Sequence, residues 1–252
     1  LPISYPTHLP VLRLLFWTCR PKTRHRLERP KAKLITPLSF FLHKSNFLFR
    51  TVYPDFLWRM SDERDHEPTI YLTFDDGPIP GVTEFVLDQL DLFEAQATFF
   101  CIGDNVSKHR DVFYKVIEAG HAIGNHTFNH LNGWKTHDDV YWANIRKCQR
   151  QMSISTNLFR PPYGRIKKSQ AAGLDPDFSV VMWDVLTGDF DPSLPPETVL
   201  QKSIHYTEPG SIVVFHDSLK AWPNLGYALP RYLAHFAALG YQFRAVPQPV
   251  YA

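Results

Sequence analysis

An uncharged run at residues 70–74 constrains the fold more than any other stretch of the chain. Its members are β-branched, aromatic or apolar, a pattern that predicts a β-strand buried on both faces. Such strands belong to parallel sheets that helices cover on both sides. Asp75 and Asp76 follow directly, and Gly77 and Pro78 end the strand, so a turn there can bring both carboxylates towards one pocket.

Strand and helix patterns alternate after this run. We expect further strands near residues 97–102, 121–125, 158–160, 179–183, 211–215 and 241–246. Helical spacing is expected near residues 82–93, 112–117, 138–152, 196–206 and 229–239. The alternation predicts an α/β fold with about seven parallel strands closed as a (β/α)-barrel, whose site would lie at the carboxyl ends of the strands.

The length and charge of the chain limit its domains and partners. A chain of 252 residues can bury one domain of ordinary size. Residues 1–50 hold ten Lys or Arg and one acid, Glu28, whereas the remainder is acidic on balance. An acidic body argues against binding to nucleic acid. Three cysteines at no metal-ligand spacing indicate neither a disulfide framework nor a cysteine zinc site.

We predict three segments. Residues 1–45 read as a basic, Pro-rich and poorly ordered extension, for which weak contact with a membrane surface is one interpretation. Residues 46–68 read as a packing arm followed by a charged linker, and residues 69–252 as the main domain. No clear signal peptide is present, and the sequence leaves open the cell envelope or the cytoplasm of a bacterium.

Two histidines predict a metal site. His126 and His130 are four residues apart, so they share one face if the segment after the third strand turns helical. With Asp76 they form a set of two imidazoles and one carboxylate, an arrangement typical of catalytic zinc. A pair of solvated or core histidines is the alternative. Asp75 adjoins a ligand without having to be one, which makes it the leading candidate for a base.

Other strand ends supply a cation and a third histidine. Arg160 could hold Asp75 ionised through a bidentate contact, and the Pro-rich loop after it could fix a backbone N–H near Tyr163 as an oxyanion donor. His216 is a candidate general acid, whose pKa either Asp189 or Asp217 could raise. Aromatic surface suited to sugar rings comes from Tyr163, Trp183 and Phe190, any of which could instead be core.

Four of these segments, residues 73–78, 126–130, 160–164 and 214–216, make residues 69–246 resemble the polysaccharide deacetylases, the carbohydrate esterase family 4 or NodB homology domain. The resemblance implies a distorted (β/α)-barrel that acts on an acetylated glycan. It implies a divalent metal, usually zinc, on Asp76, His126 and His130. The same resemblance assigns roles to further residues: Asp75 as base, His216 as acid, Arg160 and Asp189 as their partners, and the Tyr163 N–H as oxyanion donor.

The fourth and fifth motifs depart from the family pattern. Leu186 stands for an aspartate, Phe190 for a tryptophan and Val214 for a leucine, which affects the expected acetyl-binding pocket. From the resemblance as a whole, we expect removal of N-acetyl groups from a glycan that contains N-acetylglucosamine. The alternatives are hydrolysis of a small amide, esterase action on an O-acetylated glycan, and a non-catalytic glycan-binding protein on the same fold.

Overall fold

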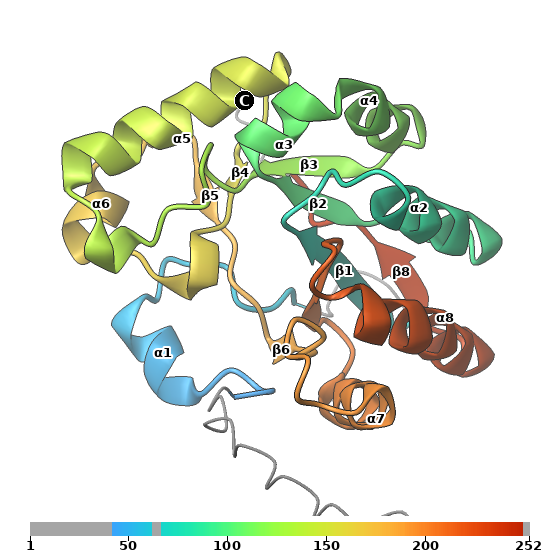
Figure 1. Ribbon diagram of the computed structural model, residues 1–252. Coiled ribbons are helices and arrows are strands. Elements are labelled where there is room, and N and C mark those ends of the chain that lie inside the picture. Colours follow the sequence, from blue (N-terminus) through green and yellow to red (C-terminus); the bar gives the residue numbers. More distant parts are fainter. Residues whose placement is uncertain (1–41, 62–66, 249–252) are drawn as a thin grey trace, which may run out of the picture. The chain divides into compact units, whose positions relative to one another are not determined.

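The strand predicted at residues 70–74 is β1, Thr69–Asp75, and it lies in the middle of the sheet (Figure 1). The computed structural model describes residues 42–61 and 67–248. The extension predicted for residues 1–45 falls almost entirely outside these ranges, as does most of the charged linker, so both stay predictions. Among the described residues, no helix has the length and apolar character needed to cross a bilayer.

The described strands form one parallel sheet. Its path runs β5–β4–β3–β2–β1–β7–β6, and β8 pairs with the first residues of β1. This path of seven strands is a curled half-barrel, which confirms the predicted fold class. The bounds are β2 Thr98–Cys101, β3 Ala122–Asn125, β4 Leu158–Phe159, β5 Ser179–Val180, β6 Val185–Leu186, β7 Ile212–His216 and β8 Gln242–Arg244.

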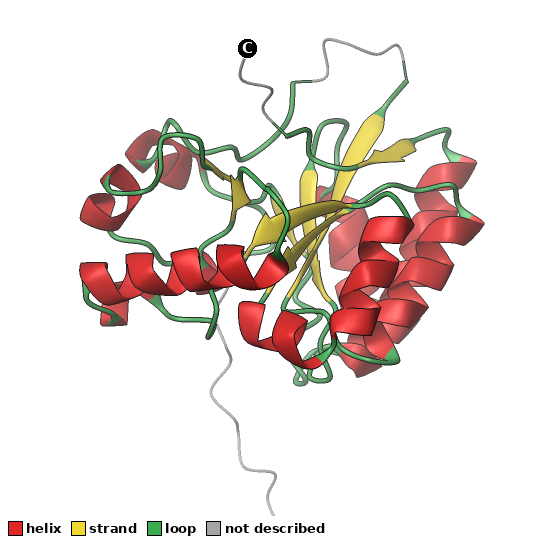
Figure 2. Ribbon diagram, turned by 90° about the horizontal axis from the view of Figure 1, so that it is seen from above, coloured by secondary structure: helices red, strands yellow, loops and turns green. Residues whose placement is uncertain are grey.

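Helices cover the outer face of the sheet (Figure 2). They are α2 Val82–Leu92, α3 Gly103–Lys108, α4 Arg110–Glu118, α5 Asp138–Met152, α6 Lys168–Ala172, α7 Pro196–Tyr206 and α8 Trp222–Ala238. The prediction missed α3, α6 and the short strand β6, and it began α8 seven residues late. Pro230 lies inside α8, and a continuous buried face, including Leu225, Leu229 and Leu233, stabilises the helix despite the missing N–H.

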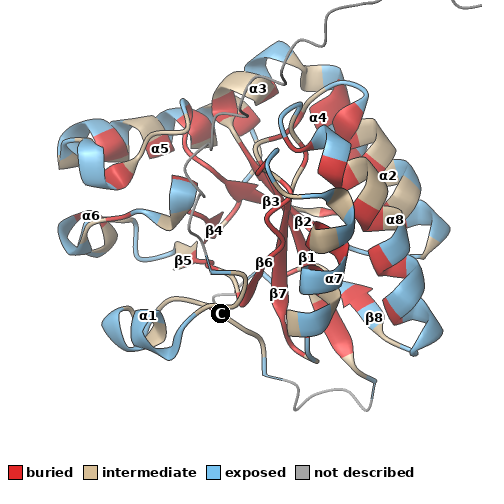
Figure 3. Ribbon diagram, turned by 60° about the horizontal axis from the view of Figure 1, so that its bottom comes forward, coloured by how far each residue is buried: buried red, intermediate tan, exposed pale blue. Residues whose placement is uncertain are grey.

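The core lies between these helices and the strands (Figure 3). The ring of Phe74 stacks on Phe99 with 5.1 Å between centroids and on Phe215 with 6.1 Å, so aromatic contacts join β1 to both neighbouring strands. Burial on both faces of β1 fixes its register, and with it the position of Asp75 at the carboxyl end.

A segment before β1 joins the two edge strands of the half-barrel. We call residues 42–61 the N-terminal arm; they include the short helix α1, Phe47–Val52. Leu57 pairs with Val181 just after β5, and Lys44 pairs with Val185 in β6. The arm therefore lies where β5 and β6 make no ladder of their own.

Candidate active site

The two carboxylates at the end of β1 have different environments. Asp75 ends the strand and is 4% exposed, whereas Asp76 adopts a φ of 85° and turns the chain. The N–H of Gly77 donates to Asp217 Oδ1 (3.0 Å). A Cβ at Gly77 would lie 1.9 Å from Asp217 Oδ2, so only glycine fits this turn.

The two histidines converge without a helix. Residues 126–130 form an irregular loop after β3, so the helical turn that would place both histidines on one face is not formed. Thr127 and His130 have φ values of 62° and 54°, which place them in the left-handed region. The Asn144 side chain accepts from the N–H groups of Phe128 and Asn129 (2.7 and 2.9 Å). These bonds from α5 hold the loop in a shape that helical spacing could not predict.

Asp76, His126 and His130 meet at one point. Each offers one ligand atom, and these atoms lie within 4.8 Å of one another. Asp76 Oδ1 is 3.3 Å from His130 Nε2 and 3.9 Å from His126 Nε2, close to the separation of about 3.4 Å between two ligands of a tetrahedral zinc ion. Asp76 Oδ1 is buried yet accepts no hydrogen bond from the described residues. A cation would satisfy it.

The protonation of the two histidines suits a metal ligand. His126 Nδ1 lies 2.8 Å from the Arg160 carbonyl, which can only accept, so Nδ1 carries the proton and Nε2 keeps its lone pair. Burial lowers the pKa of His126, and burial together with His126 lowers the pKa of His130 to about 4. Both imidazoles are therefore neutral at pH 7.

The buried Arg160 side chain holds Asp75 in place. Its Nη1 donates to Asp75 Oδ1 (2.7 Å), while Nε and Nη2 donate to the carbonyls of Val181 and Met182. The contact is single, not bidentate as predicted, because those carbonyls take the other donors. Burial alone would raise the pKa of Asp75, but Arg160, followed by the nearby histidines, holds it below its ordinary value.

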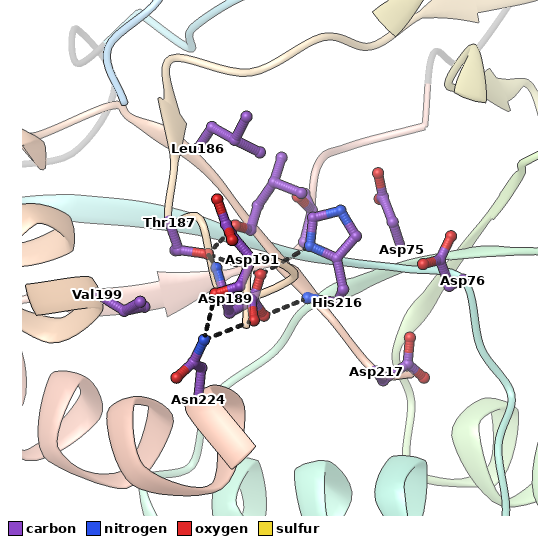
Figure 4. A network of polar contacts seen from close by, with 12 residues as sticks. Asp75, Asp76, Leu186, Thr187, Asp189, Asp191, Val199, His216, Asp217 and Asn224 are labelled. Carbon is purple, nitrogen blue, oxygen red and sulfur yellow. Dashed lines mark hydrogen bonds and ion pairs between the residues drawn. The ribbon is translucent and has the colours of Figure 1, made fainter. Parts of the chain in front are cut away.

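His216 has Asp189 as its partner. His216 Nδ1 lies 2.8 Å from Asp189 Oδ1, and the backbone N–H of His216 donates to Asp189 Oδ2 (2.7 Å; Figure 4). Burial lowers the pKa of His216, but Asp189, Asp76 and Asp75 together outweigh burial and raise it to about 9, with Asp189 as the strongest of the three. Asp217 instead accepts from Gly77 and from Thr83 Oγ1 (2.6 Å), which decides between the two predicted partners.

Most of these groups line one cleft of about 460 Å³. The Tyr163 ring packs on His130 with 4.5 Å between centroids, and the Phe190 ring lies edge-on to His216 at 5.1 Å. Arg160 and Asp189 are fully buried and lie behind the wall, not in it. The other predicted site residues all line the cleft: Asp75, Asp76, His126, His130, Tyr163, Trp183, Phe190, Val214 and His216.

Several residues of the site escaped the sequence reasoning. Thr73 is buried, and its hydroxyl receives Arg160 Nη1 (2.7 Å). Asn105 Nδ2 donates to the Asp76 carbonyl (2.7 Å) and supports the turn. Arg165 and Lys220 line the cleft just after the strand-end motifs. The sequence did contain signals for them: Thr73 is a polar residue inside an apolar strand, and Arg165 and Lys220 are charged residues just past strand ends.

Comparison with known proteins gives the family of the chain. The family model described as polysaccharide deacetylase matches residues 62–174. A peptidoglycan-N-acetylglucosamine deacetylase of Bacillus cereus is 33% identical over 193 residues, which are 73% of this chain and 89% of that protein. The chain belongs to the polysaccharide deacetylase family. A chitooligosaccharide deacetylase of Azorhizobium caulinodans is 33% identical over 60% of this chain and 75% of its own.

A crystal structure of a family member has the same fold. The peptidoglycan N-acetylglucosamine deacetylase Bc1960 superposes with a TM-score of 0.72 and 27% identity, over 81% of this chain and 95% of that one. Other relatives of this chain are longer. The chain spans 56% of a second Bacillus cereus deacetylase and 38% of one from Listeria monocytogenes.

Proposed function

We propose that this family member is a metal-dependent hydrolase that removes N-acetyl groups from a glycan containing N-acetylglucosamine. One observation carries the proposal: Asp75 and His216 face the same cleft as the group Asp76, His126 and His130. Relatives are named for peptidoglycan N-acetylglucosamine, chitooligosaccharide and chitin. An N-acetylated amino sugar is common to all of these substrates, which supports this substrate class.

Asp76, His126 and His130 would hold the divalent cation, zinc being the best match to two imidazoles and a carboxylate. Such a cation lowers the pKa of a water molecule towards about 7 and polarises a carbonyl oxygen. The neutral imidazoles and the unsatisfied Asp76 oxygen described above support this ligand set.

Asp75 is the proposed base. Arg160 keeps its carboxylate ionised, so Asp75 can accept the proton of the attacking water. His216 is the proposed acid, because a pKa of about 9 leaves its imidazole charged at pH 7 and able to protonate the departing nitrogen. Two groups with pKa values pushed in opposite directions are typical of an acid–base pair.

The remaining residues would bind and orient the substrate. The N–H of Tyr163 lies in the first turn of a 3₁₀ helix, Pro162–Gly164, where backbone donors have no partner within the helix. It is the proposed oxyanion donor. Trp183, Phe190 and Val214 would form walls around the sugar and the acetyl methyl group.

Acetate release from N-acetylated and O-acetylated glycans and from small amides, with and without chelator, tests the proposal. We expect release from N-acetylglucosamine oligomers that chelator abolishes. Asp75→Asn should lose turnover and keep the metal, whereas His126→Ala should lose both. Equal activity of both variants and the parent would contradict the assigned roles.

The same panel decides between the alternatives. Activity confined to O-acetyl esters or to small amides would replace the proposed substrate. A fold match at 22% identity to a protein described as a pseudoenzyme of Bacillus anthracis makes the absence of activity a real outcome to test. Glycan binding without release of any acyl group would identify a binding protein.

A further inference from the structure

A second cavity, of about 340 Å³, adjoins the cleft. The two cavities share Tyr163, Arg165, Trp183 and Leu186 as walls. We call the second one the arm groove, because the N-terminal arm and the ring of Trp134 supply much of its remaining wall. The two cavities are therefore neighbours, so a ligand longer than the cleft can reach past these shared residues into the arm groove.

Exposed aromatic rings line the arm groove. Trp134 is 60% exposed, Tyr163 59% and Phe49 51%. Rings of this size bury a large apolar area when they are covered, and a cluster of them at the surface marks a site of contact with another molecule.

Hydrogen bonds to the backbone fix these walls. The indole N–H of Trp134 and the hydroxyl of Tyr53 both donate to the Ile166 carbonyl (3.2 and 3.0 Å). The indole N–H of Trp58 donates to the Tyr53 carbonyl (3.1 Å). Because the polar atoms of Trp134, Tyr53 and Trp58 are bonded to backbone carbonyls, it is the apolar parts of these side chains that line the groove.

Arg165 adds hydrogen-bond donors at the junction. Its guanidinium lies 5.2 Å from the centre of the Trp134 ring, and it lines both cavities. No ion pair joins it to the described residues. An aromatic ring beside a guanidinium suits a sugar ring, because a sugar has apolar faces that stack on the aromatic ring and hydroxyls at its edge that accept hydrogen bonds.

The arm is anchored in this position. Asp184 is fully buried, and its carboxylate receives Lys44 Nζ (2.8 Å) and Arg50 Nη2 (2.5 Å), both from the arm. Trp183, the next residue, packs on Gly164, where a Cβ would lie 2.6 Å from the indole. The groove is therefore formed before any ligand binds, which reduces the entropy lost on binding.

We infer that the arm groove binds the sugar residues adjoining the one whose amide lies in the cleft, so that this protein acts on a glycan chain lying across both cavities. The inference rests on the proposed function and adds a binding site to it. The family model matches residues 62–174, which leaves the described arm outside the match. The groove therefore combines residues outside that match, such as Phe49, with residues inside it, such as Trp134 and Tyr163.

Chain-length dependence tests the inference on the full chain with its divalent metal. The measurement is the ratio of kcat/KM for the tetramer of N-acetylglucosamine to that for the dimer. Phe49→Ala and Trp134→Ala should each lower this ratio about fivefold, through KM, because each removes one stacking surface. Both side chains are exposed, so neither variant threatens folding.

Tyr114→Ala is the matched control. Tyr114 is 43% exposed on α4, away from α1 in Figure 1, and its variant should keep the parent's ratio. The inference is wrong if the ratio stays at the parent's value in both groove variants, or if dimer and tetramer lose equally. It is also wrong if the groove variants spare the tetramer and impair an alkyl glycoside of N-acetylglucosamine, because the occupant would then be an apolar group.

A parent that releases no acetate would contradict the proposed function alone. Calorimetric binding of the tetramer then decides on the groove. Tetramer binding that weakens in Phe49→Ala and Trp134→Ala supports the inference, and unchanged or absent binding overturns it.

Discussion

Replacing Asp189 by Asn tests the proposed acid. Asp189 is the strongest influence that raises the pKa of His216, to about 9, against a burial effect that lowers it. Asp76 and Asp75 follow Asp189 among the groups that raise this pKa. Asn keeps the size and a hydrogen-bonding group but removes the charge. The pKa of His216 should then fall to its ordinary value of about 6.5 or below.

The size of the effect depends on pH. His216 is active when protonated, so activity is present below its pKa and is lost as pH rises through it. A fall in pKa from about 9 to about 6.5 lowers the protonated fraction at pH 8 from about nine-tenths to about 3%. We therefore expect about a 30-fold loss of kcat/KM at pH 8 and less than about a 1.5-fold loss at pH 6.

The assay is acetate release measured as kcat/KM across the pH range, which reports the groups of the free enzyme. Asp217→Asn is the matched control, because it removes a neighbouring buried carboxylate that bonds to Gly77 and Thr83. Its alkaline limb should stay where the parent has it. An Asp189→Asn profile with an unmoved alkaline limb, or with an equal loss at every pH, would refute the reasoning.

Two further predictions concern the supports of the site. Arg160→Lys should raise the pKa of Asp75, because lysine cannot reproduce the guanidinium contact. The ionised base is then present only above the new pKa, so the acid limb of the kcat/KM profile should move to higher pH. An unmoved acid limb would contradict the Arg160–Asp75 pairing. Asp184→Asn should lower the free energy of unfolding in urea by about 2 kcal/mol, since it removes the buried carboxylate that pairs with Lys44 and Arg50. Asp104→Asn at an exposed pair should cost under about 0.5 kcal/mol. Equal losses in these two variants would contradict an anchoring role for Asp184.

The sheet was predictable because its signals are local. The uncharged run of β1 and the apolar run of β7 are typical of a covered parallel sheet, and both strands end within one residue of the predicted position. Since strand ends gather at one edge of the sheet, the sequence also predicted which residues meet there. His216 and Asp75 are directly paired in the ladder between β7 and β1, which their sequence separation hides.

The loops were not predictable because tertiary contacts decide them. Asn144 on α5 shapes the loop that carries His126 and His130, and nothing in that loop's own sequence shows it. The single contact of Arg160 with Asp75 follows from two carbonyls after β5 that occupy its other donors. A packing arm was predicted within residues 46–68, whereas Lys44 was assigned to the extension; its pairing with β6 and that of Leu57 after β5 depend on the gap between the two strands.

The acid–base pair and the candidate metal ligands are held in place by different parts of the structure. Asp75 and His216 lie on paired strands, and the N–H of Asp217 donates to the Asp75 carbonyl (3.1 Å), so the backbone ladder holds the acid and the base. Asp76 and His130 instead have positive φ values of 85° and 54°, conformations that cost about 1–3 kcal/mol each. Such strain persists only where surrounding contacts enforce it, here Asn105 on the Asp76 carbonyl and Asn144 on the histidine loop. Because these supports are independent of the sheet, disturbing the loops changes ligand geometry while the acid–base pair keeps its place.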